Sequence, residues 1–255
     1  MSGRLQRCLP ALLFALAGSA TAARYVPLPA ARFASTIPAD GKDAPANIRP
    51  FLLRTEPVTN AEFLAFVEAH PDWRRDRVAS LLADAHYLAH WAGPAALGTA
   101  AGPRQPVTQV SWFAAEAYCE SEGARLPTWY EWEYAAAADA SRRDARGDPA
   151  WRQAQLSGNA HPSGAPLPDI GGAPNVYGVR DIAGPVWEWV DDFNALLVAG
   201  DSRDQNDPDV LQFCGAGALA LRQKENYAVL MRIAVLSALK ASDTTRNLGF
   251  RCAKP

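Results

Sequence analysis

Arg125-Leu-Pro-Thr-Trp-Tyr-Glu-Trp-Glu-Tyr134 has the pattern of a helix start followed by a broad buried face. Thr128 and Glu131 have the spacing of a capping box, in which each side chain bonds the backbone amide of the other residue. One wide face of the helix then gathers Trp129, Trp132, Glu133 and Ala136. The segment therefore predicts a helix that begins after Thr128 and packs large aromatic side chains.

The segments upstream predict two more helices and a strand. A helix is expected from Ser111, and Gly123 supplies the stop signal at its end. Thr59 and Glu62 form an earlier capping box, and the apolar residues that follow them recur at helical spacing. Phe51–Arg54 is predicted to be a short strand.

Helical periodicity fades after about residue 140, where Gly, Pro and Asn recur and the strands look short. Helices early and irregular β structure late, without βαβ alternation, indicate an α+β fold. The 20 prolines and 18 glycines support a loop-rich fold, since a helical bundle would tolerate that much Pro badly. We find no internal repeat and no linker, so residues 23–255 are predicted to form one domain.

The composition is that of a globular protein and narrows the possible partners. The chain has 255 residues, of which 49% are hydrophobic and 20% charged, and this argues against a disordered chain. The net charge of -2 leaves no basic face for nucleic acid. We expect a monomer that binds no nucleic acid.

Residues 1–22 have the pattern of a secretory signal peptide. Arg4 and Arg7 form a positive n-region, Leu9–Ala17 an apolar stretch too short to span a bilayer, and Ala20-Thr-Ala22 a cleavage site. An uncleaved membrane anchor is the alternative. We expect cleavage after Ala22 and export to the periplasm or the exterior, with no membrane-spanning segment in the mature protein.

Export would bring the protein into an oxidising compartment, in which cysteines can form disulfides. Of the four cysteines, Cys8 lies in the signal peptide, and Cys119, Cys214 and Cys252 remain after its removal. Three cysteines allow one internal disulfide and leave one thiol over. The residues alone leave the bridged pair open.

Asp181-Ile-Ala-Gly-Pro-Val-Trp-Glu188 is the strongest candidate for metal binding. Two carboxylates bracket a glycine turn whose backbone carbonyls can point into the same space, and oxygen ligands at this density suit Ca²⁺. The spacing is equally compatible with a structural turn. A zinc site at His86 and His90 is not favoured, because Tyr87 stands where a zinc hydrolase needs a glutamate.

Eight short runs occur in a recognisable order and cover nearly the whole mature chain: Pro57–Phe63, Pro106–Trp112, Ala117–Cys119, Gly123–Thr128, Glu131–Tyr134, Asn175–Gly178, Ala183–Trp189 and Asn247–Cys252. Each run alone is weak evidence. Together and in this order they resemble the formylglycine-generating enzyme family, also called the sulfatase-modifying-factor family. The resemblance implies an elaborated C-type-lectin-like fold with little regular secondary structure, which is consistent with the α+β prediction.

The resemblance also implies an active site, and there this chain departs from the family. Family members oxidise a cysteine of a sulfatase peptide to formylglycine with a pair of cysteines that binds copper(I). Counting back without gaps from Asn247 places that pair at Gln223 and Ala228. Neither residue is a thiol, and copper(I) needs soft ligands. We therefore expect no copper and no formylglycine-generating activity.

An exported maturation or modification factor, acting on a peptide-like substrate or a partner protein, is the expected function. The family also resembles a periplasmic pyoverdine-maturation protein that acts without the cysteine pair. The candidate groove residues are Cys214, Gln223, Tyr227 and Arg232, with Trp187 as a packing wall. Arg232 matches a family arginine, and a structural salt bridge is its alternative role. An oxidoreductase-type enzyme and a non-catalytic binding or scaffold domain both stay open, because lectin-like folds often bind without chemistry.

Two structural features are implied by the resemblance alone. The family pairs its Ala-Tyr-Cys and Gly-Phe-Arg-Cys cysteines, which implies a disulfide between Cys119 and Cys252. One structural Ca²⁺ is implied as well, and its ligands would be Asp181, the carbonyls of Gly184 and Val186, and Glu188. The second calcium site of the family is expected to be lost.

Overall fold

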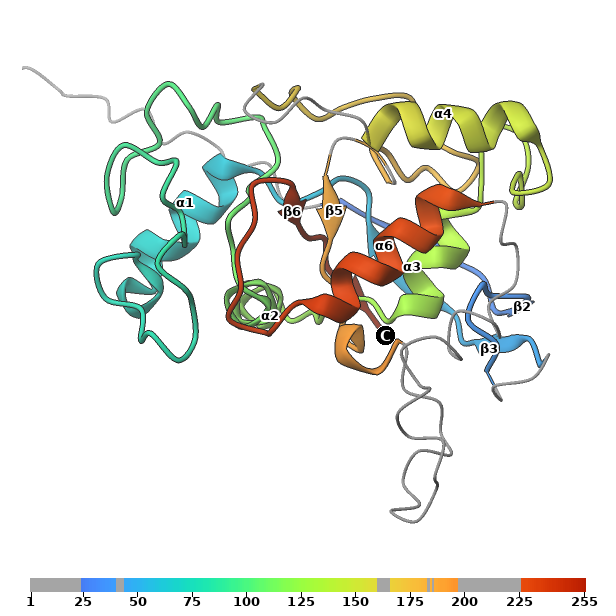
Figure 1. The fold of residues 1–255 in the computed structure, drawn as a ribbon, viewed down its shortest axis with the longest axis horizontal. Coiled ribbons are helices and arrows are strands. Elements are labelled where there is room, and N and C mark those ends of the chain that lie inside the picture. Colours follow the sequence, from blue (N-terminus) through green and yellow to red (C-terminus); the bar gives the residue numbers. More distant parts are fainter. Residues whose placement is uncertain (1–23, 40–43, 160–165, 183, 185, 197–225) are drawn as a thin grey trace, which may run out of the picture.

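The computed structural model describes residues 24–39, 44–159, 166–182, 184, 186–196 and 226–255. The predicted signal peptide lies outside these residues, as do Cys214 and Gln223. Within the described residues, short strands and separate helices are joined by long irregular segments (Figure 1). The fold is α+β with little regular secondary structure, as the sequence predicts.

The strands form small sheets. They are β1 (Tyr25–Leu28), β2 (Ala31–Phe33), β3 (Ala46–Ile48), β4 (Phe51–Arg54), β5 (Trp187–Glu188), β6 (Leu248–Gly249) and β7 (Ala253–Lys254). β4, the strand that the sequence predicts, lies between β1 and β7 in an antiparallel sheet, with Tyr25 opposite Arg54 and Leu52 opposite Lys254. β2 pairs with β3, and β5 runs parallel to β6. The first and last described strands are thus joined through one central strand.

The helices are α1 (Asn60–Ala69), α2 (Trp112–Ser121), α3 (Trp129–Ala136), α4 (Pro149–Asn159) and α6 (Tyr227–Ala238), with 3-10 turns at Pro71–Trp73 and Phe193–Ala195. Both predicted capping boxes are confirmed: the side chain of Thr59 accepts from the Glu62 amide, and that of Thr128 from the Glu131 amide. Ser111 is the N-cap of α2, and its side chain accepts from the Ala114 amide. None of the described helices combines the length and the apolar character needed to cross a bilayer.

α4 and α6 contradict the prediction that helical structure ends near residue 140. α6 has the sequence YAVLMRIAVLSA, in which apolar residues surround the helix, so no polar face marks the helical period. α4 is mostly polar, and Pro149 favours its first position through a fixed φ. The two helices pack against each other. Their stability therefore comes from tertiary contact rather than from a local pattern.

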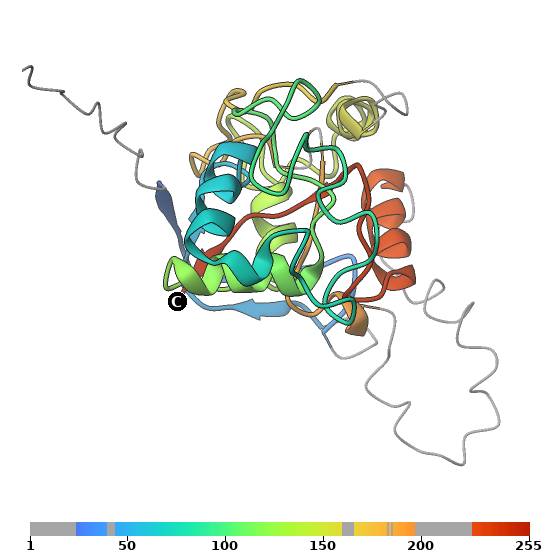
Figure 2. The same ribbon diagram turned by 90° about the vertical axis from the view of Figure 1, so that its left-hand side faces the viewer.

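A core of aromatic side chains lies between α1, α2 and the C-terminal segment. The ring centroid of Phe63 lies 5.8 Å from that of Tyr118 and 6.0 Å from that of Phe250. Trp129 and Trp132 of α3 are fully buried, as expected for its wide face. In Figure 2 the C-terminal segment runs through the middle of the molecule and ends beside α2.

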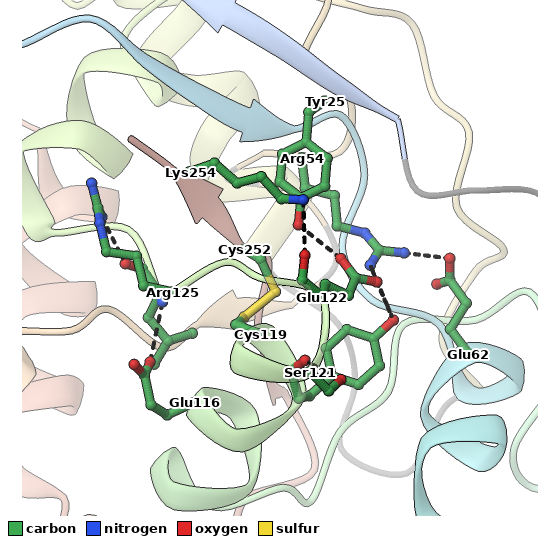
Figure 3. Close-up of a disulfide and its surroundings, with 12 residues drawn as sticks. Tyr25, Arg54, Glu62, Glu116, Cys119, Ser121, Glu122, Arg125, Cys252 and Lys254 are labelled. Carbon is green, nitrogen blue, oxygen red and sulfur yellow. Dashed lines mark hydrogen bonds and ion pairs between the residues drawn. A yellow bond between two sulfur atoms is a disulfide. The ribbon is translucent and has the colours of Figure 1, made fainter. Parts of the chain in front are cut away.

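Cys119 of α2 and Cys252 beside β7 form the disulfide that the family resemblance implies. Their Cα atoms are 5.5 Å apart, and both residues are fully buried. Beside the bridge, Glu122 accepts hydrogen bonds from Tyr25 Oη at 2.7 Å and from Arg54 Nη1 at 2.8 Å (Figure 3). The disulfide therefore sits in a network that joins β1, β4, α2 and the C-terminus.

Candidate ligand pocket between α3, α4 and α6

A narrow pocket lies where α3, α4 and α6 meet. Its walls include Trp132, Ala136, Arg146, Gln155, Ala228 and Arg232. Figure 1 shows the arrangement that forms it, with α6 crossing in front of α3 and α4 running above both. The cavity has a volume of about 10 Å³, which is about the room that one water molecule needs. The site as it stands therefore has room for about one water-sized group.

Arg232 extends from α6 to line this pocket and is buried, with a relative exposure of 1%. Its guanidinium lies over the ring of Trp132, with Cζ 3.8 Å from the ring centroid, which is a cation–π contact. Neither terminal nitrogen has a hydrogen-bond partner among the described residues. Burial lowers the pKa of Arg232 to about 10, so the side chain stays protonated at neutral pH.

Glu188 and Arg251 form a closed ion pair near this guanidinium. Arg251 Nε and Nη2 each donate to a different oxygen of Glu188 at 2.8 Å, and both side chains are fully buried. Trp132 Nε1 donates to the same carboxylate, 2.8 Å from Oε2. Arg232 is attracted by Glu188 and repelled by Arg251. Glu188 thus lies near two guanidiniums and accepts hydrogen bonds from Arg251 and Trp132, and none from the terminal nitrogens of Arg232.

Glu133 supplies a second buried carboxylate in the pocket wall, and its bonds are satisfied. It accepts from the Thr36 amide at 2.9 Å and the Thr36 hydroxyl at 2.6 Å, and also from Ser35 Oγ. Arg146 Nη1 pairs with Glu133 at 3.2 Å, while Arg146 Nη2 lies 2.6 Å from Asp144. This wall is therefore fixed by its own partners and provides no counter-charge for α6.

Arg232 is the one predicted groove residue that the described part of the chain places in the pocket. Tyr227, in the first turn of α6, is 63% exposed. Trp187 lies in β5 and packs against the core instead. Cys214 and Gln223 fall outside the described residues. A structural salt bridge, the alternative role for Arg232, is not formed with any described residue through its terminal nitrogens.

The pocket wall also contains Trp132 and Gln155, and the sequence does not indicate this role for either residue. Trp132 lies on the predicted packing face of α3. The sequence around it does not indicate that the guanidinium of Arg232 from α6 packs on its ring. Gln155 lies on α4, a helix that the sequence does not predict. Only the meeting of α3, α4 and α6 in space brings these side chains together.

Ala228 lies in the pocket wall, at the position where counting back from Asn247 places the second cysteine of the family pair. Its exposure is 7%, and it presents a methyl group. Among the described residues the cysteines are Cys119 and Cys252, which bond to each other. The described part of the site therefore contains no thiolate that could bind copper(I).

The predicted calcium ligands have other partners. Both oxygens of Asp181 accept backbone hydrogen bonds, from Gly171 at 2.8 Å and Gly172 at 3.1 Å, and both oxygens of Glu188 bond Arg251. No group of three or more His, Cys, Asp or Glu side chains that could hold a metal ion occurs in the described ranges. A cation at Glu188 would also meet the charge of Arg251. These contacts fit the structural-turn alternative for Asp181 and do not fit Ca²⁺, whose site stays a prediction.

Comparison with known proteins gives the family of the chain. A family model described as "Sulfatase-modifying factor enzyme 1-like domain" matches residues 14–255. The formylglycine-generating enzyme of Streptomyces coelicolor is 32% identical over 271 aligned positions, which cover 87% of this chain and 84% of the relative. The "Inactive C-alpha-formylglycine-generating enzyme 2" of Mus musculus is 31% identical over 283 positions, covering 92% and 87%.

Two further similarities are more limited. The hercynine oxygenase of Mycolicibacterium thermoresistibile is 35% identical over 170 positions, which cover 60% of this chain and 37% of the relative. Among solved structures, that of CarF gives a TM-score of 0.49 at 15% identity and covers 91% of this chain and 98% of that chain. The family model and the extended similarity to the Streptomyces enzyme decide the classification: the protein belongs to the sulfatase-modifying factor enzyme 1-like family.

Proposed function

We propose that this protein is an exported maturation factor that binds a peptide-like segment of a substrate or partner protein in the pocket between α3, α4 and α6. The observation that carries the proposal is Arg232, a buried guanidinium without a hydrogen-bond partner among the described residues. The same pocket contains aromatic, aliphatic and amide groups. Such a mixture is typical of binding sites, in which apolar walls provide contact and a few polar groups fix orientation.

Copper-dependent formation of formylglycine is not part of this function. Ala228 has only a methyl group where the family motif places a copper-binding cysteine, and copper(I) needs soft ligands. Cys119 and Cys252 are bonded to each other and buried, so neither can supply a thiolate. The mouse relative named as inactive supports the existence of family members without that activity.

A comparison of exported proteins from a wild-type and a gene-deletion strain tests the maturation role. Peptides from the exported proteins are compared by mass spectrometry, and the deletion is complemented with the wild-type gene or with Arg232→Met. We expect at least one peptide to change mass in the deletion strain and to be restored by the wild-type gene alone. Identical peptide masses in both strains would refute the maturation role and favour a non-catalytic binding or scaffold domain.

The expected absence of copper binding and of formylglycine formation can be tested on the purified protein. Incubation with copper(I) and a Cys-x-Pro-x-Arg peptide in air is expected to yield no aldehyde, and the protein should not retain copper after gel filtration. Stoichiometric conversion of the peptide cysteine to formylglycine would overturn the assignment of Gln223 and Ala228 to the positions of the cysteine pair.

A further inference from the structure

We infer that the pocket between α3, α4 and α6 binds a carboxylate group through the guanidinium of Arg232. Arg232 is a buried guanidinium whose two terminal nitrogens have no acceptor among the described residues. Arg232 and Arg251 carry one positive charge each, and Glu188 carries one negative charge that Arg251 already holds with two hydrogen bonds. Burial of an unpaired charge is strongly unfavourable unless another group compensates it.

The other described charges of the pocket wall are paired among themselves. Glu133 accepts from Thr36 and Ser35 and pairs with Arg146 at 3.2 Å. Arg146 is further held by Asp144 at 2.6 Å. The three carboxylates Glu188, Glu133 and Asp144 equal the three guanidiniums in number, but all of their ion pairs among the described residues are with Arg251 and Arg146. The acceptor that Arg232 lacks therefore has to come from outside this set of residues.

The contact with Trp132 satisfies only one part of the Arg232 side chain. A cation over an aromatic ring uses the flat face of the guanidinium, whereas its N–H groups donate in the plane. Nη1 and Nη2 have no acceptor among the described residues, so this in-plane edge is open. Two N–H groups in a rigid fork match the two oxygens of a carboxylate. Trp132 thus holds the fork in position for a planar anion.

Charge and size favour a carboxylate over a phosphate group. A carboxylate brings one negative charge to the single open guanidinium edge, whereas a phosphate ester carries more at neutral pH. The cavity of about 10 Å³ has about the room of one water molecule, so the smaller anion needs less movement of the walls. Ala136, Ala137 and Val229 line the cavity and offer apolar contact to the carbon that bears the carboxylate. Gln155 lines the same pocket and has a buried Oε1 without a partner; a half-turn of its amide would exchange this acceptor for an NH₂ donor.

This inference deepens the proposed function, because it names the group by which a peptide-like ligand would be recognised: a carboxylate, from an acidic side chain or a chain end. The inference rests on the proposed function only for the source of that carboxylate. Binding of a carboxylate to Arg232 does not depend on the proposed function, and a small free carboxylate tests this binding directly.

Acetate is the probe, because it carries one carboxylate and one methyl group. The purified protein is placed in chloride buffer, and sodium chloride is replaced stepwise by sodium acetate at constant ionic strength. Saturation transfer to the acetate methyl protons, measured by NMR, reports binding, and the thermal midpoint reports stabilisation. We expect a saturation-transfer signal and a rise in Tm with acetate.

Matched variants assign the effect to the site. Arg232→Met removes the guanidinium and should weaken acetate binding roughly tenfold or more and abolish the rise in Tm. Arg77→Met makes the same exchange at an exposed position and should behave like the wild type. Arg232→Lys keeps the charge but not the fork, and its weaker acetate signal tests the geometry even if the methionine variant fails to fold.

Three results would overturn the inference: no acetate signal in the folded wild-type protein, equal stabilisation by chloride, or an unchanged signal in Arg232→Met. A final variant tests whether an acidic side chain of the protein itself occupies the site. It converts to amides the five acidic residues of 197–225, a segment outside the described residues: Asp201, Asp204, Asp207, Asp209 and Glu225. If only this variant binds acetate, a carboxylate of the chain itself occupies the site and the inference is wrong. Acetate binding that depends on Arg232, without a mass change in the deletion strain, would keep the inference and refute the proposed maturation role.

Discussion

Removal of the Cys119–Cys252 disulfide is expected to lower the free energy of unfolding by about 5 kcal/mol. The bridge closes a loop with a sequence separation of 133 residues. For a loop of that length, the chain-entropy relation gives a loss of about 17 cal/mol/K in the unfolded state, or about 5 kcal/mol at about 25 °C. The unfolded chain regains this entropy when the bridge is absent, while the packing around the two buried positions is largely kept.

The assay is urea unfolding of the double variant Cys119→Ala/Cys252→Ala, followed by tryptophan fluorescence and circular dichroism. Cys214→Ala is the matched control, since it removes a cysteine and leaves the bridge in place; it should unfold like the wild type. The m value, which is the slope of the free energy of unfolding against urea concentration, should rise in the double variant. The reason is that the unfolded chain without the bridge exposes more surface. A loss of less than about 2 kcal/mol would refute the loop-entropy argument.

The Glu188–Arg251 ion pair, His90 and Asp181 can each be tested by a change in stability. Arg251→Met should lower the free energy of unfolding by about 3–5 kcal/mol in urea titrations, because Glu188 stays buried without its partner; addition of Glu188→Gln should recover much of the loss. Burial lowers the pKa of His90 from 6.5 to about 4, so the unfolded chain takes up the proton first, and thermal stability should fall as the pH decreases from about 6.5 to about 4. His90→Gln should remove that part of the pH dependence, and an unchanged profile would contradict the assignment. EDTA should leave Tm unchanged if Asp181 bonds only backbone amides, whereas a fall in Tm that Ca²⁺ reverses would confirm the calcium prediction.

The features that the sequence predicted correctly depend on local spacing or on family motifs. The capping boxes at Thr59 and Thr128 follow from residues three positions apart, and local backbone geometry alone makes them form. The strand Phe51–Arg54 is short but apolar, and it is central in its sheet. The pairing of Cys119 with Cys252 came from the family motifs and not from the spacing of the cysteines.

The features that the sequence did not predict depend on contacts between distant segments. α6 has apolar residues all round, so its sequence does not show which side is buried or that Arg232 is on that side. The partner of Glu188 is Arg251, 63 residues later, and this pairing leaves Arg232 without an acceptor among the described residues. A sequence motif identifies the arginine, but only the fold shows that another arginine has taken the nearby carboxylate.

The C-terminal segment determines when the chain can finish folding during synthesis. Residues 247–254 supply β6 and β7, one half of the disulfide, and Arg251. Until they leave the ribosome, β4 lacks its neighbour β7, Cys119 lacks its native partner Cys252, and Glu188 lacks the guanidinium of Arg251 that bonds it. The nascent chain therefore stays short of its native state until residue 254 has left the ribosome.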